Sequence, residues 1–471
     1  MLPEMLAVMA IVTQDQAALR SAPRDSAQQQ AVLWQGEALE VRGEKLGFLQ
    51  VYDHRLERGG YIRASQVRTT QLKPSEAPEL LAVIRFLRDT PGAEALGISY
   101  TAAYLKAAPA EAIGPEAFDA LGSMAERLAR RASGRHSKAD DTTIAAHLEV
   151  AASYGITISS QEREGRVQLC YNGEAFRRVL ALAATEEQKA RAALALTRPD
   201  CINPDMPPVE RYGFDTWRAD VLDRVDVSKL SEFQKNRIRL RQAGVWSSLA
   251  YERTRRGENT AQASANRALQ ALAGINKSEL AEEDLRDYTD AAVRVGASRW
   301  AGNTVPAGGG KFTIELSTGQ PGETCVNLIN AGAKSPKEKH VFLQRCTYGL
   351  VWPASVSVNP QGTALALAVQ PLDTWRELWL FRQTASGWVL DVLPPATNPD
   401  LGYLEFAGWV PGGSQMLAAR EAKVDGRFIR KFEIINLGTL ETTKQADNPQ
   451  SLSLFYRWQS PLWKSGTISI R

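Results

Sequence analysis

The spacing of apolar residues changes twice along this chain. Near the N-terminus Val32 and Trp34, and then Leu39 and Val41, recur at a period of two, which is typical of a half-buried β-strand. From about Ser75 the apolar residues recur at i, i+3, i+4 and i+7, the period of an amphipathic helix. Beyond Asn303 short strand-like runs return and continue toward the C-terminus. The sequence therefore predicts a multidomain α+β protein: a β region, an all-helical region and a second β region.

The points where the period changes give the expected domain boundaries. A chain of 471 residues is long enough for about three domains of roughly 150 residues each. We expect a small β-barrel over residues 1–72, an α-helical domain over residues 73–300 and an all-β domain over residues 301–471. The middle domain has two alternatives, a tetratricopeptide-like array and an irregular bundle. Its run Thr185–Gln188 is a capping box and predicts a helix start. The Gly-rich stretch Asn303–Phe312 is expected to be a linker or turn.

Charge and composition exclude two classes of partner. The formal net charge is only +3, whereas nucleic-acid binding needs a concentrated basic face. No stretch approaches the roughly 20 apolar residues of a membrane-spanning helix. Met1–Val12 lacks a basic segment and a cleavage site, so we expect a chain without a secretory leader. The densest basic group is expected to be a solvated helix end: Arg127, Arg130, Arg131, Arg135 and Lys138.

The four cysteines form no CxxC pair, so zinc-ribbon and thioredoxin-like sites are not expected. They fall into two local pairs, and we expect one disulfide in each, Cys170–Cys201 and Cys325–Cys346. Closing each loop would stabilise the fold by roughly 3 kcal/mol. Paired cysteines favour an oxidising compartment, which predicts a periplasmic or secreted bacterial protein. The alternative is four buried thiols in a cytosolic protein.

A series of short motifs lies in the N-terminal region. Ala18–Pro23 reads ALRSAP, Gln35–Val41 reads QGEALEV, Gly47–Val51 reads GFLQV and Gly60–Ile62 reads GYI. In this order the motifs resemble the bacterial SH3 (SH3b) family, with Phe and Tyr at two positions where that family has Trp. The resemblance implies an SH3-like barrel whose ligand class is peptidoglycan or peptides.

Two phrases in the C-terminal region are similar to each other. Ser357–Leu367 reads SVNPQGTALAL, and Phe406–Leu417 reads FAGWVPGGSQML. Both resemble the blade phrase of TolB-like and WD40-like propeller proteins, and Glu377–Phe381 resembles the strand that follows it. The resemblance implies propeller-like repeats, either in a partial propeller or in a sandwich. The last residues, Thr467–Arg471, are expected to form a strand.

Motifs for catalysis or metal binding are absent from the sequence. It contains neither HExxH nor GxSxG, and Gly308–Lys311 lacks the spacing of a phosphate-binding loop. Residues that can bind metals lie close together at His136, Asp140, Asp141 and His147. We expect a solvated loop at His136 and a helix cap at the Asp pair, with His147 on the helix that follows. The sequence therefore predicts no catalytic residue, no metal and no cofactor.

Aromatic residues are the candidates for ligand binding. We expect Trp34, Tyr52 and Tyr61 to line a shallow groove in the first domain, since exposed aromatics often serve recognition. This predicts a non-enzymatic binding or scaffold protein that engages cell-wall peptidoglycan or an envelope protein. The alternative is a peptidoglycan hydrolase or an accessory subunit of one, because SH3b domains often accompany such enzymes.

Overall fold

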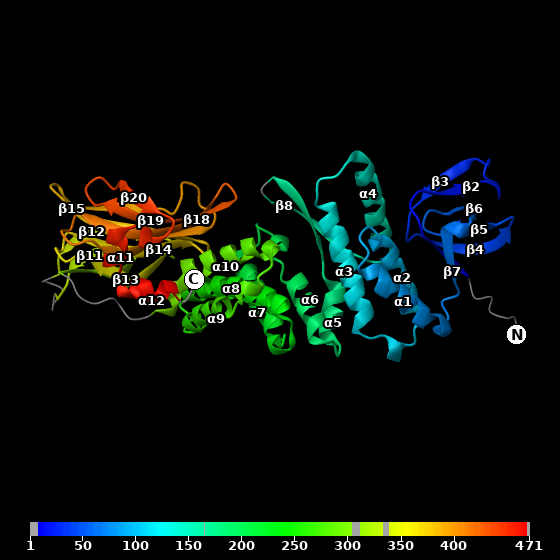
Figure 1. The fold of residues 1–471 in the computed structure, drawn as a ribbon, viewed down its shortest axis with the longest axis horizontal. Helices are drawn as coiled ribbons and strands as arrows, with labels where there is room; N and C mark the ends of the chain where they lie inside the picture. The colour runs from blue at the N-terminus through cyan, green and yellow to red at the C-terminus, as the bar shows by residue number, and fades with distance from the viewer. Residues whose placement is uncertain (1–7, 164, 304–310, 333–338, 469–471) are drawn as a thin grey trace. The chain divides into compact units, whose positions relative to one another are not determined.

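The computed structural model describes residues 8–163, 165–303, 311–332 and 339–468. The chain divides into two compact units. The first unit is Met1–Pro207 with Arg224–Asp226, and the second is Pro208–Asp223 with Val227–Arg471. Figure 1 follows the chain from an N-terminal antiparallel sheet through a central helical region to a C-terminal β-sheet region. This order confirms the multidomain α+β prediction, while the boundaries at residues 72 and 300 stay predictions.

The described part of the first unit begins with a seven-stranded sheet in the order β3-β2-β6-β5-β4-β1-β7. Its strands are β1 (Met9–Val12), β2 (Ala17–Arg20), β3 (Gln29–Leu33), β4 (Ala38–Lys45), β5 (Phe48–Asp53), β6 (Arg58–Arg63) and β7 (Val67–Thr70). Alternate side chains fill one core, in which Leu33 and Ile62 are fully buried. The β4–β5 turn places Leu46 and Gly47 at φ of 54° and 75°, as tight hairpins require. These described strands form no closed barrel.

Helices make up most of the rest of the first unit. The described ones are α1 (Ala77–Arg88), α2 (Glu94–Ala107), α3 (Pro115–Ala132), α4 (Lys138–Ser153), α5 (Glu174–Ala181) and α6 (Glu186–Leu196). The predicted capping box at the start of α6 is confirmed, since Thr185 Oγ1 accepts from the Gln188 amide at 3.3 Å.

A β-hairpin interrupts these helices. It consists of β8 (Ile158–Arg163) and β9 (Arg166–Tyr171), which pair antiparallel. The prediction of an all-helical middle region is therefore wrong here. The physical reason is visible in the sequence, because Val167, Leu169 and Tyr171 alternate at the period of a strand.

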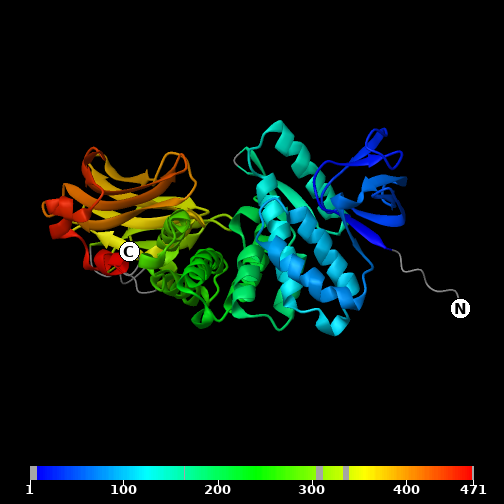
Figure 2. The same cartoon turned by 45° about the vertical axis from the view of Figure 1, so that its right-hand side comes forward.

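The first sheet and the helices that follow it share a core. Ile11 of β1 is 2% exposed and belongs to the same cluster as Leu80 and Ile84 of α1. Figure 2 shows this sheet, in dark blue, lying against the helices of the first unit. The N-terminal sheet is thus a packed part of the first unit.

The second unit begins with helices and continues with strands. Its described helical part is α7 (Pro208–Asp223), α8 (Glu232–Arg255), α9 (Ala261–Ala273), α10 (Leu285–Ser298) and the short 3₁₀-helix η8 (Arg299–Gly302). Among the described residues, no helix is long and apolar enough to span a membrane.

The strands of the second unit form three antiparallel groups. The first group is β10 (Phe312–Thr318), β11 (Thr324–Asn330) and β12 (Val341–Thr347). We call the second group the first meander: β13 (Leu350–Val358), β14 (Ala364–Leu372), β15 (Trp375–Thr384) and β16 (Gly387–Leu393). The third group is the second meander: β17 (Gly402–Trp409), β18 (Gln415–Val424), β19 (Arg427–Asn436) and β20 (Thr442–Ala446). A short parallel pairing of β15 with β17 joins the two meanders.

These groups stack as layers, and strand β14 shows how. Its Leu365 and Leu367 pack against β10–β12, whereas its Ala364 and Ala366 pack against the second meander. Because both faces of β14 are covered, its sequence is a continuous apolar run over most of the strand, without polar alternation. On the far side of the second meander, Phe432 packs against α11 (Ser453–Trp458) and α12 (Pro461–Ile468).

The C-terminal prediction is corrected by α12. Residues 467 and 468 belong to this helix, so the predicted strand over 467–471 is wrong for them. A terminal helix follows here because the preceding Ser460-Pro461 pair starts a helix, with Pro at its first turn. Residues 469–471, and residues 304–310 of the predicted linker, lie outside the described residues. The described strands form no closed propeller.

Candidate functional site

Two of the three predicted aromatic residues share one face of the first sheet. Tyr61 of β6 pairs with Gln50 of β5, which lies two residues before Tyr52. Side chains two residues apart lie on the same side of a strand, so the tyrosines are diagonal neighbours about 7–8 Å apart. Both are partly exposed. We call Gln50, Tyr52 and Tyr61 the tyrosine face.

Charged side chains hold the Tyr52 ring in place. The Arg42 guanidinium lies 3.9 Å from the ring centre, and the His54 ring meets the ring edge with centroids 4.9 Å apart. Glu40, opposite Tyr52 on β4, lies 2.7 Å from His54 Nε2 and accepts a hydrogen bond from Arg42. The contacts with His54 and then Arg42 lower the pKa of Glu40 below its usual range. The result is an aromatic surface surrounded by hydrogen-bonding groups.

Trp34 lies apart from the tyrosine face. It follows β3, which β2 and β6 separate from β5 in the sheet. Its side chain is half-buried, and its carbonyl accepts from the Glu37 amide at 3.1 Å in a tight turn. The structure therefore brings Tyr52 and Tyr61 together and places Trp34 elsewhere.

The turn that contains Trp34 is packed against helices of the same unit. Gln35 Nε2 donates to the Gly92 carbonyl at 3.0 Å, and the Tyr154 hydroxyl donates to the Gly36 carbonyl at 2.8 Å. A Cβ atom at Gly36 would lie 2.6 Å from the Ala95 carbonyl oxygen, and φ there is 90°, so only glycine fits. This edge of the sheet is covered, in contrast to the tyrosine face.

A buried charge network lies behind that turn. Glu94 pairs with Arg127 Nε at 2.7 Å and with Arg131 Nη1 at 3.0 Å. Arg131 Nη2 lies 2.8 Å from His147 Nδ1, and because arginine only donates, the His147 proton sits on Nε2 and faces Asp15 Oδ1 at 2.8 Å. Two carboxylates thus balance two guanidinium groups. We call Asp15, Glu94, Arg127, Arg131 and His147 the closed cluster.

The closed cluster corrects two expectations. The predicted solvated helix end is wrong for Arg127 and Arg131, because both pair with Glu94, which is 1% exposed. His147 lies on helix α4, as expected, but it is 1% exposed and so is not part of the expected solvated region. Burial by itself would raise the pKa of Asp15, but the hydrogen bond from His147 lowers it below its usual range.

Glu37 belongs to the same turn and carries a shifted carboxyl group. Burial raises its pKa to about 7, although Arg55 and Arg58 approach its oxygens to 3.6 and 3.9 Å. Asp53 and Glu149 contribute in the same direction as burial. The contact between the sheet and the helices therefore contains a group that titrates near neutral pH.

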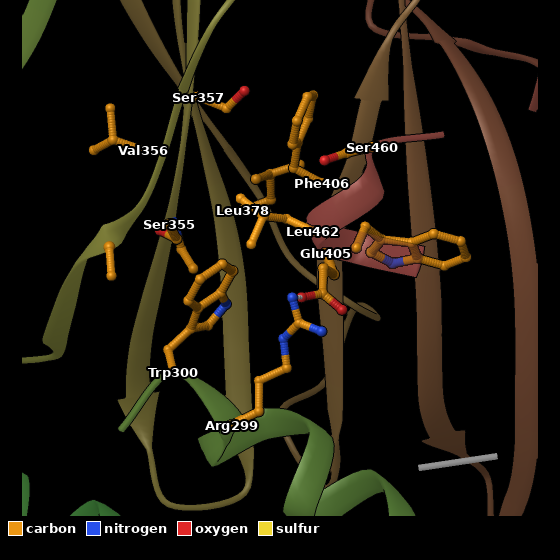
Figure 3. A pocket seen from close by; sticks show the side chains of 13 residues that line it. Arg299, Trp300, Ser355, Val356, Ser357, Leu378, Glu405, Phe406, Ser460 and Leu462 are labelled. Carbon is orange, nitrogen blue, oxygen red and sulfur yellow. Dashed lines mark hydrogen bonds and ion pairs between the residues drawn. The ribbon is translucent and has the colours of Figure 1, made fainter. Parts of the chain in front are cut away.

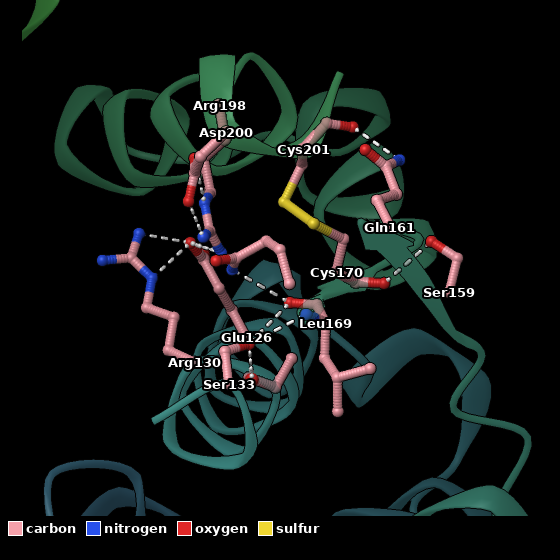
Figure 4. Close-up of a disulfide and its surroundings, with 12 residues drawn as sticks. Glu126, Arg130, Ser133, Ser159, Gln161, Leu169, Cys170, Arg198, Asp200 and Cys201 are labelled. Carbon is pink, nitrogen blue, oxygen red and sulfur yellow. Dashed lines mark hydrogen bonds and ion pairs between the residues drawn. A yellow bond between two sulfur atoms is a disulfide. The ribbon is translucent and has the colours of Figure 1, made fainter. Parts of the chain in front are cut away.

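The first predicted disulfide is present and joins Cys170 of β9 to Cys201 (Figure 4). Polar contacts surround it: Gln161 Nε2 donates to the Cys201 carbonyl at 3.1 Å, and Ser133 Oγ accepts from the Leu169 amide at 2.8 Å. A two-stranded hairpin is only marginally stable alone. The bridge therefore fixes the β8–β9 hairpin to the segment that follows α6.

The second predicted disulfide joins Cys325 of β11 to Cys346 of β12, which pair directly across the sheet. In the described residues, the group that could offer metal ligands is Glu323 with these two cysteines. Because both sulfur atoms are bonded to each other, they provide no thiolate for a metal. This group is a cross-strand bridge with a neighbouring carboxylate.

Sequence reasoning missed a set of buried charges in the second unit: Arg299, Arg376 and Glu405. Arg376 is fully buried on β15, and Glu405 is 5% exposed on β17. A signal was available, because a charged residue in a strand covered on both faces requires a partner. This signal is weak in the sequence, because the charged partners lie on η8, β15 and β17, far apart along the chain.

Comparison with known proteins yields no relative: no family model, no curated protein and no solved structure matches the chain. The geometry thus defines the class on its own, an α+β protein of two compact units with two disulfides.

Proposed function

We propose that this protein is a non-enzymatic binding or scaffold protein of the bacterial periplasm that engages peptidoglycan through the tyrosine face. The observation that carries the proposal is that Tyr52 and Tyr61 are diagonal neighbours on a partly exposed sheet surface. Aromatic rings offer a flat apolar surface, and the neighbouring Gln50, Arg42 and His54 offer hydrogen bonds. This combination of a flat apolar surface and hydrogen-bonding groups suits sugar and peptide ligands.

The two disulfides support the location. Intracellular reduction keeps most cytosolic thiols free, whereas disulfides persist in the periplasm and outside the cell. Mass spectrometry of protein taken from its native compartment without reductant should show both bridges. Four free thiols would contradict the periplasmic location and favour the cytosolic alternative.

The same proposal includes finer fold assignments for the first sheet and for the C-terminal strands. The successive pairing of β4, β5 and β6 supports an SH3b-like first sheet. The two four-stranded meanders support propeller-like repeats, because one of the two similar phrases spans the first turn of each meander. A tetratricopeptide-like arrangement of the helices stays a prediction.

The experiment that tests the function is a pull-down on purified peptidoglycan, combined with an assay for released muropeptides. We expect retention without release. Tyr52→Ala should weaken retention about tenfold, since an anchoring aromatic side chain contributes more than 1 kcal/mol to binding. The matched control is Tyr348→Ala, because Tyr348 is 60% exposed and lies in the second unit.

Each alternative has its own outcome. Release of muropeptides would contradict a non-enzymatic role and favour the hydrolase. Absence of retention would contradict peptidoglycan as the partner and leave an envelope protein. Equal losses in Tyr52→Ala and Tyr348→Ala would contradict the role of the tyrosine face.

A further inference from the structure

A cavity of about 70 Å³ lies inside the second unit (Figure 3). Its walls come from both meanders, from η8 and from the segment that leads into α12. Side chains that line it include Arg299, Trp300, Ser357, Glu405 and Trp463. Four separate parts of the chain therefore converge on one partly open cavity.

The charges at the cavity are unbalanced. Glu405 Oε1 lies 2.7 Å from Arg299 Nη2 and 3.5 Å from Arg376 Nη2. Arg376 Nη1 donates to the carbonyls of Gly296 and Ala297 at 2.7 and 3.1 Å, which are neutral acceptors. Two guanidinium groups thus share one carboxylate. We call Arg299, Arg376 and Glu405 the open cluster, and its net charge is positive.

A buried surplus charge is unfavourable unless something compensates it. Burial lowers the pKa of Arg376 to about 10, even though Glu405 and the face of the Tyr403 ring lie beside its guanidinium group. Arg376 nevertheless remains protonated at neutral pH. An anion in the cavity would remove the imbalance.

The cavity also presents hydrogen-bond donors that have no acceptor. The indole nitrogens of Trp300 and Trp463 make no hydrogen bond, and these side chains are 9% and 3% exposed. Figure 3 shows the Trp300 nitrogen on the side of the ring that faces the Arg299–Glu405 pair. The Ser357 hydroxyl accepts from Trp409 Nε1 at 3.0 Å and keeps its own proton to donate.

The remaining wall is apolar, which limits the kind of anion. Val356, Leu378 and Phe406 line the cavity beside the two indole rings. At about 70 Å³ the space is about half of the ~150 Å³ that holds benzene, and it is partly open, so it suits a carboxylate group whose short aliphatic chain lies toward the opening. A doubly charged, fully hydrated anion would lose its hydration without gaining apolar contacts.

We propose that the cavity is a binding site for a short-chain carboxylic acid, held by Arg299 and by the indole N–H groups of Trp300 and Trp463. The carboxylate would balance the open cluster and accept from the free donors. The aliphatic chain would lie against the apolar wall. This site is independent of the tyrosine face, so the two proposals can fail separately.

The test uses the full chain with ¹⁵N-labelled tryptophan, and the probe is butyrate in chloride-free buffer. The chain has 11 tryptophans, each with one indole N–H signal. Trp300→Phe and Trp463→Phe each delete one signal and so assign the two reporters. We expect butyrate to shift these two signals with a dissociation constant on the order of 1 mM, which is reasonable for so small a ligand.

Variants identify the groups that bind. In Trp300→Phe the Trp463 signal should report affinity about tenfold weaker, because one charge-assisted hydrogen bond is lost while the ring shape is kept. Arg299→Gln should weaken affinity at least as much. The matched control is Arg382→Gln, which removes another half-buried arginine, paired with Asp391 at 2.7 Å in the same sheet. Unshifted signals from the other indoles confirm that each variant is folded.

The neutral isostere butyramide and the inorganic anion chloride complete the experiment. Both should leave the two reporter signals unchanged at concentrations where butyrate saturates them. Absence of a shift with butyrate would overturn the proposal and leave a cavity that holds only water. An equal shift with butyramide, or with chloride, would overturn carboxylate recognition.

Discussion

The protein contains two buried charge clusters that differ in their balance. In the closed cluster of the first unit, Asp15 and Glu94 compensate two arginines, and His147 links them by hydrogen bonds. In the open cluster of the second unit, Glu405 alone faces Arg299 and Arg376. Free indole donors and a cavity lie beside the open cluster.

The difference distinguishes structural charges from binding charges. A balanced cluster compensates its own charges and joins two parts of a fold, here the first sheet and its helices. An unbalanced cluster beside a cavity has surplus charge that a ligand can compensate. Burial alone does not separate the two cases, since both clusters contain side chains that are almost fully buried.

The largest effect is expected from Glu94→Gln. This change leaves two half-buried guanidinium groups without their buried carboxylate, so the free energy of unfolding of the first unit should fall by about 3 kcal/mol. Hydrogen exchange of α2 and α3 measures it within this chain of two units. The control Glu79→Gln removes an exposed pair with Arg68 and should cost under about 1 kcal/mol. Equal losses would contradict the closed cluster.

Removing one arginine from each cluster compares them directly. Arg131→Gln takes a cation from a balanced set and leaves His147 Nδ1 without a donor, so the first unit should lose about 3 kcal/mol. Arg299→Gln removes the surplus cation, and the second unit should lose only about 1 kcal/mol. Hydrogen exchange measures both. A larger loss for Arg299→Gln would show that the open cluster needs both arginines for stability.

The pH dependence should reveal Glu37. Its pKa is higher in the folded protein, about 7 against 4.5, so its contribution to stability is fully present below pH 4.5 and is lost between pH 4.5 and 7. Glu37→Gln should therefore stabilise the first unit by about 2 kcal/mol above pH 7 and change little below pH 4.5. Stability curves of both proteins against pH test this. Parallel curves would contradict the raised pKa.

The smallest effect is expected from Tyr154→Phe. Its hydroxyl donates to the Gly36 carbonyl at 2.8 Å and lies 2.8 Å from Ser99 Oγ, so it connects the first sheet to the helices. Losing this group should reduce the stability of that contact by about 1 kcal/mol. Faster exchange should be limited to the turn around Gly36 and to α4. An unchanged exchange pattern would show that the closed cluster alone fixes the sheet.

Local signals in the sequence predicted the local features. The change of period located the sheet, the helices and the C-terminal strands, and the capping box at Thr185 marked the start of α6. Local cysteine pairing predicted both disulfides. The β8–β9 hairpin was missed although its alternation is readable, because the surrounding helical pattern outweighed two short strands.

Features that depend on distant residues could not be predicted. The sequence places His147 on a helix, but its partner Asp15 lies 132 residues earlier in the chain. Trp34, Tyr52 and Tyr61 were expected to line one groove, but only the strand order shows that β2 and β6 separate β3 from β5. The open cluster needed three separate segments to meet, which no spacing in the sequence indicates.

The most direct test of the difference between the clusters is hydrogen exchange of the full chain with and without butyrate. A ligand that binds only the folded protein slows exchange in the elements around its site. We expect slower hydrogen exchange in β13, β17 and η8, and unchanged exchange in α2 and α3 of the first unit. Slower exchange around Glu94, or no change around Glu405, would contradict it.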